Sequence, residues 1–212
     1  MHKKKLLIFD YDGVIVDSIE VIRKAYNSVH AHYNMPYADT HEAISKKLEK
    51  NFFQTLADYG LTQEQITKYF HEIKEKIESY EDQIMPFPDM QTLLAQTAAL
   101  YSCAIVTSGH KETVMKVLTR YNMHNHFRLL LGADSEQSKV RKIEKTLAHF
   151  GIEKEYTYFI SDTSGDILEG KEVGVTTIGV SWGYHTKETL ASANPDYLFE
   201  TVGELEKFLL HV

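Results

Sequence analysis

The second half of the chain alternates short apolar runs with segments whose apolar residues recur at helical spacing. The short runs indicate strands buried on both faces, and the longer periodic segments indicate amphipathic helices. Strands joined through helices in this way form a parallel sheet that helices cover on both sides. We therefore expect a doubly wound α/β core with strands at residues 5–9, 102–106, 128–131, 156–160 and 176–180 and helices near 90–98, 112–121, 140–150 and 166–173.

The strand pattern is interrupted by residues 17–83, which are rich in long helical patterns and poor in β-branched runs. The segment Pro86-Phe87-Pro88 ends the interruption, because proline stops helices and stiffens the chain. The sequence thus predicts an α/β core formed by residues 1–16 and 84–212, with residues 17–83 inserted as a separate α-helical domain.

The inserted segment contains two pairs with the spacing of helix capping residues, Asp17 with Glu20 and Thr62 with Gln65. One or two shorter helices are expected between them, over residues 42–59. The helix after Thr62 carries a stripe of apolar and aromatic residues that is wide enough to pack on neighbouring helices. Its members are Ile66, Tyr69, Phe70, Ile73, Ile77 and Tyr80. Core packing explains such a stripe without any ligand.

Two aspartates, Asp10 and Asp12, come directly after the apolar run of residues 6–9. Residues two apart in an extended chain face the same way, and Gly13 lets the backbone turn sharply just beyond them. Paired carboxylates repel one another unless a positive charge lies between them, and a divalent cation meets that need. Because Asp-x-Asp also occurs by chance in solvated loops, the pair predicts a metal-holding reactive centre only if other acids join it.

A second acidic pair, Asp162 and Asp166, follows the predicted strand at 156–160, and the four-residue spacing suggests one face of a starting helix. Thr107-Ser108-Gly109 follows another predicted strand. Ligands of open parallel sheets bind beyond the carboxyl ends of the strands, so we expect these segments to meet. Hydroxyl and amide groups ahead of a helix can cradle an anion, although Thr-Ser-Gly is also typical of a simple helix cap and turn.

The chain carries a formal net charge of −7, which argues against nucleic acid as a primary partner. Lys3-Lys4-Lys5 begins like a signal peptide, but the apolar run after it stops at Asp10, before a full hydrophobic region is reached. No stretch approaches the length of a membrane span. We expect a cytoplasmic protein with no membrane partner, in which the single cysteine, Cys103, is a small buried residue.

Four segments, taken in order, resemble the motifs of the haloacid dehalogenase (HAD) superfamily of phosphohydrolases, and the resemblance extends over essentially the whole chain. They are Asp10-Tyr11-Asp12-Gly13-Val14, Val106-Thr107-Ser108, Lys139, and Asp162 with Asp166. The early helical insertion matches the subgroup with a helical cap domain. The later segments Ser181-Trp182-Gly183-Tyr184-His185-Thr186 and Pro195-Asp196-Tyr197-Leu198 are similar to those of phosphoglycolate phosphatase-like members. Dehalogenases of the superfamily lack the second aspartate, so Asp12 favours phosphate chemistry.

The resemblance implies Mg²⁺-dependent hydrolysis of a small phosphorylated metabolite through an aspartyl-phosphate. Asp10 would attack phosphorus, and Asp12 would protonate the leaving alcohol and then activate water. Asp10, the backbone carbonyl of Asp12, and Asp162 would hold Mg²⁺, with Asp166 as a direct or water-mediated contact.

The same resemblance implies that Thr107, Ser108, Gly109 and Lys139 bind the phosphoryl oxygens. In the third motif of the family the lysine is commonly followed by proline, which Lys139 is not, so Lys142 is an alternative for this role. The dipeptide Gly109-His110 stands where phosphoglycolate phosphatases often have Asn-Lys. The resemblance therefore does not name the substrate.

Other functions stay open at this point. A sugar phosphomutase of the same superfamily would return the phosphoryl group to its substrate, and a noncatalytic phosphate-sensing or phosphoacceptor module would not turn over. Lys46, Lys47 and Lys50 are candidates for contacting an acidic part of a substrate, although a solvated helix face also explains them. The metabolite and the oligomeric state are not specified by the sequence.

Overall fold

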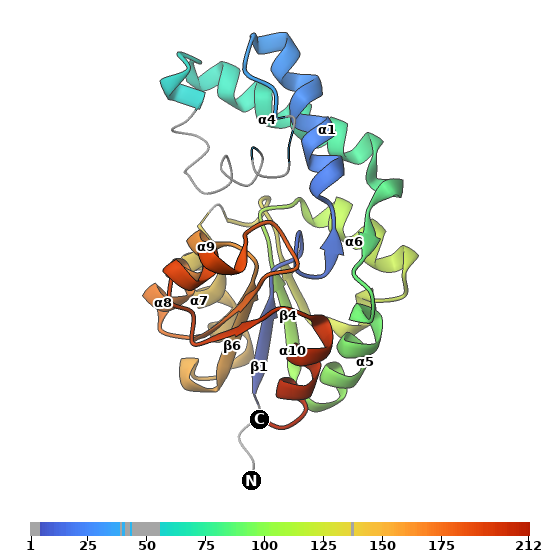
Figure 1. The fold of residues 1–212 in the computed structure, drawn as a ribbon, viewed down its shortest axis with the longest axis vertical. Coiled ribbons are helices and arrows are strands. Elements are labelled where there is room, and N and C mark those ends of the chain that lie inside the picture. Colours follow the sequence, from blue (N-terminus) through green and yellow to red (C-terminus); the bar gives the residue numbers. More distant parts are fainter. Residues whose placement is uncertain (1–4, 39, 41–42, 44–55, 137) are drawn as a thin grey trace. The chain divides into compact units, whose positions relative to one another are not determined.

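The computed structural model describes residues 5–38, 40, 43, 56–136 and 138–212. The chain divides into two compact units, one formed by Met1–Asp17 with Met85–Val212 and the other by Ser18–Ile84. Figure 1 shows the path of the chain through both. The candidate lysines at positions 46, 47 and 50, and most of the predicted short helices at 42–59, lie outside the described residues.

A parallel sheet forms the centre of the first unit. Its strands, within the described residues, follow the spatial order β5-β4-β1-β6-β7-β8, and each neighbouring pair runs parallel. The strands are β1 (Leu6–Phe9), β4 (Ser102–Val106), β5 (Leu129–Leu131), β6 (Thr157–Ser161), β7 (Thr176–Val180) and β8 (Tyr197–Phe199). The predicted α/β sheet is confirmed, and β8 is an addition to it.

Helices cover both faces of this sheet. They are α5 (Met90–Leu100), α6 (Lys111–Arg120), α7 (Lys139–Phe150), α8 (Ser164–Val173), α9 (Lys187–Ser192) and α10 (Val202–Leu209), with short 3-10 turns η3 (His124–His126) and η4 (Lys154–Tyr156). Helices α7 and α8 pack on each other, as do α5 and α10, and Figure 1 shows the two pairs on opposite faces. The fold is therefore doubly wound.

The central strand β1 explains why the sheet needs both layers. All four of its residues are buried, as expected for a strand covered on both faces. Leu6 and Ile8 share a core cluster with Ile143 of α7, because alternate side chains of a strand point the same way. Cys103 in β4 is buried as predicted, and burial raises its pKa to about 12.

A short ribbon stands where the chain leaves and re-enters the first unit. Strands β2 (Val16–Asp17) and β3 (Met85–Pro86) pair antiparallel. Asp17 therefore belongs to a strand, and the predicted capping by Asp17 and Glu20 is wrong: the following helix begins after Ser18, which makes no side-chain capping bond. Pro86 is compatible with this ribbon. Proline has no backbone N–H to donate, and an edge strand tolerates the loss of that hydrogen bond.

Helices dominate the described part of the second unit. They are α1 (Ile19–His30) and α4 (Gln63–Ser79), which pack on each other, with the 3-10 turns η1 (Ala31–Tyr33) and η2 (Glu81–Gln83). The predicted capping box of Thr62 and Gln65 is confirmed. Tyr69 of the predicted stripe is fully buried, and its hydroxyl oxygen lies 2.7 Å from Nε2 of the buried His30. Among the described helices, none combines the length and apolar character needed to cross a membrane.

Candidate active site

Asp10 lies at the carboxyl end of the central strand. Its amide donates to the carbonyl of Ile160 at 2.9 Å, so the backbone pairing of β1 with β6 continues one residue past the strand. The carboxylate is buried, and its Oδ1 accepts a hydrogen bond from the amide of Tyr11 at 2.7 Å. This local bond holds the side chain in one orientation at the sheet edge.

A tight turn follows Asp10 and brings the first motif against the fourth. Gly13 has a φ of +74°, a conformation that side chains with a Cβ rarely adopt, and its amide donates to the carbonyl of Val16 at 2.9 Å. A Cβ at Gly13 would overlap the carboxylate of Asp162. Asp12 points toward the loop after β4, since its Oδ2 lies 3.5 Å from where a Cβ on Gly109 would be. Glycine is therefore required at position 13 for this close approach.

Lys139, the first residue of α7, joins two of the acids. Its Nζ lies 2.6 Å from Oδ2 of Asp10 and 2.6 Å from Oδ2 of Asp166. The hydroxyl of Ser161 also donates to Oδ2 of Asp166, at 2.6 Å. These four side chains are buried and form one hydrogen-bonded chain.

The charges within this chain shift one another's pKa values. Burial raises the pKa of Asp10 well above its usual range, against the opposing effect of the Lys139 ammonium. Burial alone would also raise the pKa of Asp166, but the charge of Lys139 and the hydrogen bonds to Asp166 outweigh it and lower that pKa to about 2. Burial lowers the pKa of Lys139, and the two carboxylates more than reverse this. Lys139 is therefore a permanent cation.

Asp162 is fully buried beyond the end of β6. Its Oδ2 accepts a hydrogen bond from the amide of Tyr184 at 2.7 Å, while its Oδ1 is buried with no hydrogen-bond partner in the described part of the chain. Burial raises its pKa to about 7 in spite of the Tyr184 amide. Asp162 precedes α8, which begins at Ser164 after the capping residue Thr163. The prediction that Asp162 shares a helix face with Asp166 is therefore wrong.

The Thr107 loop closes the sheet edge between β4 and α6. The hydroxyl oxygen of Thr107 accepts a hydrogen bond from the amide of Gly109 at 2.9 Å, and Ser108 is exposed. The carbonyl oxygen of Thr107 accepts from Nζ of Lys142 at 2.6 Å. The two candidate lysines of α7 thus have different partners, since Lys139 contacts the acids and Lys142 contacts the backbone of this loop.

The donor set fits a hydrated Mg²⁺. Mg²⁺ usually binds one or two carboxylates and keeps several waters, and Asp10 and Asp162 offer two buried carboxylates here. Oδ1 of Asp162 is buried and, among the described residues, has no hydrogen-bond partner, so a bound cation would satisfy it. Asp162 also raises the pKa of Asp10, so the two carboxyl groups repel each other as a cation site would require.

Some polar contacts of this region have no signal in the sequence. Asp134, in the loop after β5, accepts a hydrogen bond from the amide of Lys111 at 3.0 Å and so caps α6. The indole of Trp182 donates to the carbonyl of Val14 at 3.2 Å, which ties the loop after β7 to the first motif. Both contacts join segments that are distant in the chain, and local spacing could not reveal them.

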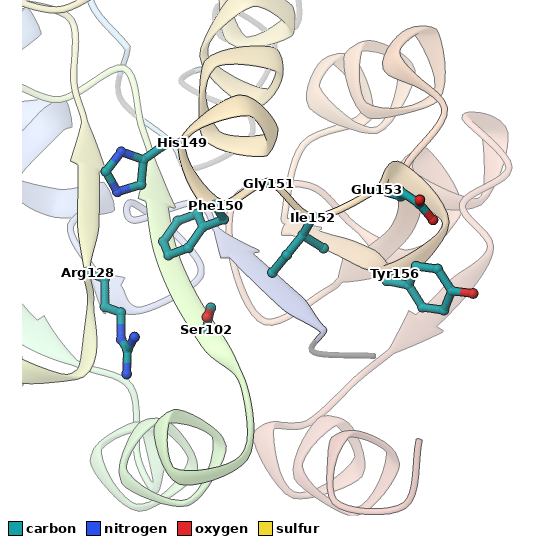
Figure 2. Close-up of a pocket in the computed structure, with 8 residues that line it drawn as sticks. All are labelled: Ser102, Arg128, His149, Phe150, Gly151, Ile152, Glu153 and Tyr156. Atoms are coloured by element: carbon teal, nitrogen blue, oxygen red, sulfur yellow. The ribbon is translucent and has the colours of Figure 1, made fainter. Parts of the chain in front are cut away.

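The pocket in Figure 2 lies apart from this cluster. It has a volume of about 580 Å³ and is lined by Ser102, Arg128, His149, Phe150, Gly151, Ile152, Glu153 and Tyr156. Ser102 pairs with Leu6 at the amino end of the parallel strands, whereas Asp10 follows their carboxyl end. The pocket and the cluster therefore occupy opposite edges of the sheet.

Comparison with known proteins identifies the family. The model of haloacid dehalogenase-like hydrolases matches residues 7–180. "Probable phosphatase IndB" of Dickeya dadantii is 29% identical, over 95% of this chain and 92% of its own length. Phosphoglycolate phosphatase of Synechococcus elongatus is 25% identical and pyrophosphatase PpaX of Halalkalibacterium halodurans 27% identical, each over 94% of both chains.

The fold agrees with this match. The solved structure of SP0104 from Streptococcus pneumoniae, a haloacid dehalogenase-like family hydrolase, is 22% identical and superposes with a TM-score of 0.84 over 98% of this chain and 99% of its own. The family match covers most of the chain and includes its central sheet up to β7. This chain therefore belongs to the haloacid dehalogenase-like hydrolases and is a phosphatase of that family.

Proposed function

We propose that the chain is a Mg²⁺-dependent phosphatase that hydrolyses small phosphomonoesters through an aspartyl-phosphate on Asp10. The observation that carries this proposal is the salt bridge of 2.6 Å between Asp10 and Lys139, buried at the sheet edge where the first and fourth motifs meet. A carboxylate held beside a permanent cation is both oriented and kept available as a nucleophile. The ammonium also offsets the effect of burial on Asp10, which otherwise favours the neutral acid.

Asp12 serves as the general acid and base in this proposal. It follows Asp10 by two residues and is less buried, and its carboxylate points toward the loop after β4. From there it can give a proton to the leaving alcohol and later take one from the attacking water. Asp10, which is held by Lys139 and the Tyr11 amide, is fixed for attack on phosphorus instead.

The proposed metal ligands are Asp10, the backbone carbonyl of Asp12, and Asp162. When bound, Mg²⁺ would neutralise charge on the phosphoryl oxygens and on the two acids. Asp166 has a different proposed role, because its Oδ2 already accepts hydrogen bonds from Lys139 and Ser161. We assign it to orienting Lys139, with any contact to the metal through water.

The phosphoryl oxygens would be bound by Lys139 and by the loop after β4. The Thr107 hydroxyl accepts from Gly109 and keeps its own proton to donate. The amide of Ser108 supplies a second donor in this proposal. Such groups gain most when negative charge spreads over the oxygens in the transition state.

The names of two relatives suggest the substrate class. Phosphoglycolate phosphatase and pyrophosphatase PpaX act, by their names, on a small phosphomonoester and on pyrophosphate. We propose a substrate of this size for the present chain, in which a small acidic or polar group is attached to phosphate.

Phosphate release from a panel of phosphomonoesters and pyrophosphate, with Mg²⁺ and again with a chelator, tests the proposal. Release that requires Mg²⁺ and is lost in Asp10→Asn is expected. Asp82→Asn, an exposed change in the second unit, is the matched control and retains activity. Release that survives in Asp10→Asn would remove Asp10 as the nucleophile. An isomeric sugar phosphate, formed through a bisphosphate intermediate without net phosphate release, would instead identify a phosphomutase.

A further inference from the structure

Lys142 is a buried cation that the proposed chemistry does not use. It lies on α7, fully buried, with Nζ 2.6 Å from the carbonyl oxygen of Thr107. Burial of a charged amine is costly unless the charge has a specific partner. Burial first, and then repulsion from Lys139, lower the pKa of Lys142 to about 8. Because burying this charge is costly, the contact of Lys142 with Thr107 is expected to have a role other than packing.

The partner of Lys142 belongs to the loop after β4, residues 107–109, which we propose binds phosphate. The carbonyl of Thr107 and the amide of Ser108 are the two ends of one planar, conjugated peptide unit. A donor that binds the carbonyl oxygen draws electron density from the amide and strengthens the N–H as a donor, and a charged donor does so most. The ammonium of Lys142 therefore acts on the amide of Ser108 without touching it.

The geometry of the loop places the Ser108 amide, and not that of Gly109, where Lys142 can strengthen it as a donor to phosphate. Of the two amides that follow Thr107, that of Gly109 is engaged within the loop by the Thr107 hydroxyl oxygen at 2.9 Å. Ser108 is exposed, while Lys142 approaches the same peptide unit from the buried side. The Lys142 ammonium and the Ser108 amide are thus at opposite ends of one peptide unit, and Ser108 is the exposed residue of that unit.

We propose that Lys142 is a positioning residue that strengthens and orients the Ser108 amide as a phosphate donor, acting through the Thr107–Ser108 peptide. This inference rests on the proposed phosphate site. The two lysines then have different roles. Lys139 contacts Asp10 directly, whereas Lys142 contacts the buried carbonyl oxygen of Thr107 and acts on the Ser108 amide through the peptide bond. The alternative is that Lys142 only ties α7 to the end of β4.

Three variants separate these roles. Lys142→Met keeps the length of the side chain and removes the donor, and Lys142→Gln keeps a neutral donor. Lys145→Met is the matched control, since Lys145 is on the same helix, exposed, and paired with Glu136 at 3.2 Å. Inhibition by inorganic phosphate measures how tightly the loop after β4 binds phosphate. The Mg²⁺ concentration for half-maximal activity measures how tightly the metal site binds Mg²⁺.

The inhibition constant for phosphate is expected to rise about tenfold in Lys142→Met, the scale of one charge-assisted hydrogen bond. A smaller rise is expected in Lys142→Gln and none in Lys145→Met, with the Mg²⁺ requirement unchanged in all three. A purely structural tie would lower thermal stability in both Lys142 variants and leave the phosphate constant of the folded protein unchanged. That result would overturn the inference.

The amide resonance of Ser108 gives a readout without turnover. In ¹⁵N-labelled protein, loss of the Lys142 donor should move the Ser108 amide proton upfield, more in Lys142→Met than in Lys142→Gln. If Lys142→Met does not fold, Lys142→Gln decides alone, and an unmoved resonance with an unchanged phosphate constant contradicts the coupling. If the wild-type chain releases no phosphate, the proposed function fails, while the Ser108 shift still tests the effect of Lys142.

Discussion

The ammonium nitrogen of Lys139 lies 2.6 Å from Oδ2 of Asp10, although 129 positions separate the two residues in the chain. Both side chains are buried, so water does not solvate either charge and each depends on the other for compensation. The same nitrogen contacts Asp166 at 2.6 Å. Removal of Lys139 therefore leaves two carboxylates without their counter-charge inside the protein.

Lys139→Met is expected to lower the free energy of unfolding by about 3–5 kcal/mol, the usual cost of breaking a buried ion pair from one side. The double variant with Asp10→Asn should recover part of this loss, because one of the two stranded carboxylates is then gone. Urea unfolding of the single and double variants measures both effects. A double variant that is less stable than Lys139→Met would show that the pair does not compensate charge as described.

Asp162→Asn is expected to abolish stabilisation by Mg²⁺. A ligand that binds only the folded state adds about 2.7 kcal/mol at a hundred times its dissociation constant. In the proposed metal site, Asp162 supplies a buried oxygen that has no partner among the described residues. Thermal unfolding with and without Mg²⁺ measures this. Asp196→Asn is the control, because Asp196 binds Thr177 at 2.7 Å and takes no part in the proposed metal site. An equal Mg²⁺ response in wild type and Asp162→Asn would remove Asp162 from the site.

Gly13→Ala is expected to abolish activity, since the new methyl group overlaps the Asp162 carboxylate and the φ of +74° is strained for alanine. Gly203→Ala is the matched control, because a Cβ there meets nothing within 4 Å. Helix α10 should gain about 0.5–1 kcal/mol from that change. Phosphate release and urea unfolding of both variants are the measurements, and an active Gly13→Ala would contradict the close approach.

Lys142 makes stability depend on alkaline pH. Its pKa in the folded protein is about 8, below the ordinary value of 10.5, so the unfolded chain binds the extra proton between these values. Below pH 8 the free energy of unfolding carries the full cost of burying the charged amine. That cost falls as the pH rises toward 10.5, so the folded state becomes more stable over this range. At about 1.4 kcal/mol per pKa unit, the effect is on the order of 3 kcal/mol.

Lys142→Met lacks this titration, so wild type should gain stability relative to the variant as the pH rises from 7.5 to 10. Urea unfolding of both proteins across this range measures the difference, and common changes at other titrating groups cancel. A difference that stays constant with pH would show that Lys142 is charged throughout and that its burial is not costly.

The central sheet could be predicted because its inner strands are continuous apolar runs. The predicted bounds of β4 and β7 agree with the structure. Strand β8 (Tyr197–Phe199) lacks such a signal, since it has three residues and none is fully buried. The start of α1 was mispredicted for a different reason, because Asp17 is committed to a ribbon with Met85 that only the folded chain brings together.

The choice between Lys139 and Lys142 illustrates what local pattern cannot decide. The two residues lie about one helical turn apart on α7, and both are buried. Helical spacing therefore gives them the same face and the same expectation. The register of α7 against the sheet separates them, since it brings one to Asp10 and the other to the Thr107 carbonyl.

The most direct measurement is the mass of the Asp10 peptide after reaction of Asp12→Asn with 4-nitrophenyl phosphate and Mg²⁺. This leaving group needs no proton from Asp12, so the first step proceeds while hydrolysis of the intermediate is slowed. A phosphoryl group on Asp10, with one burst of 4-nitrophenol, is the expected result. Continuous release of 4-nitrophenol with Asp10 unmodified, or phosphorylation of another residue, would contradict the nucleophilic role of Asp10.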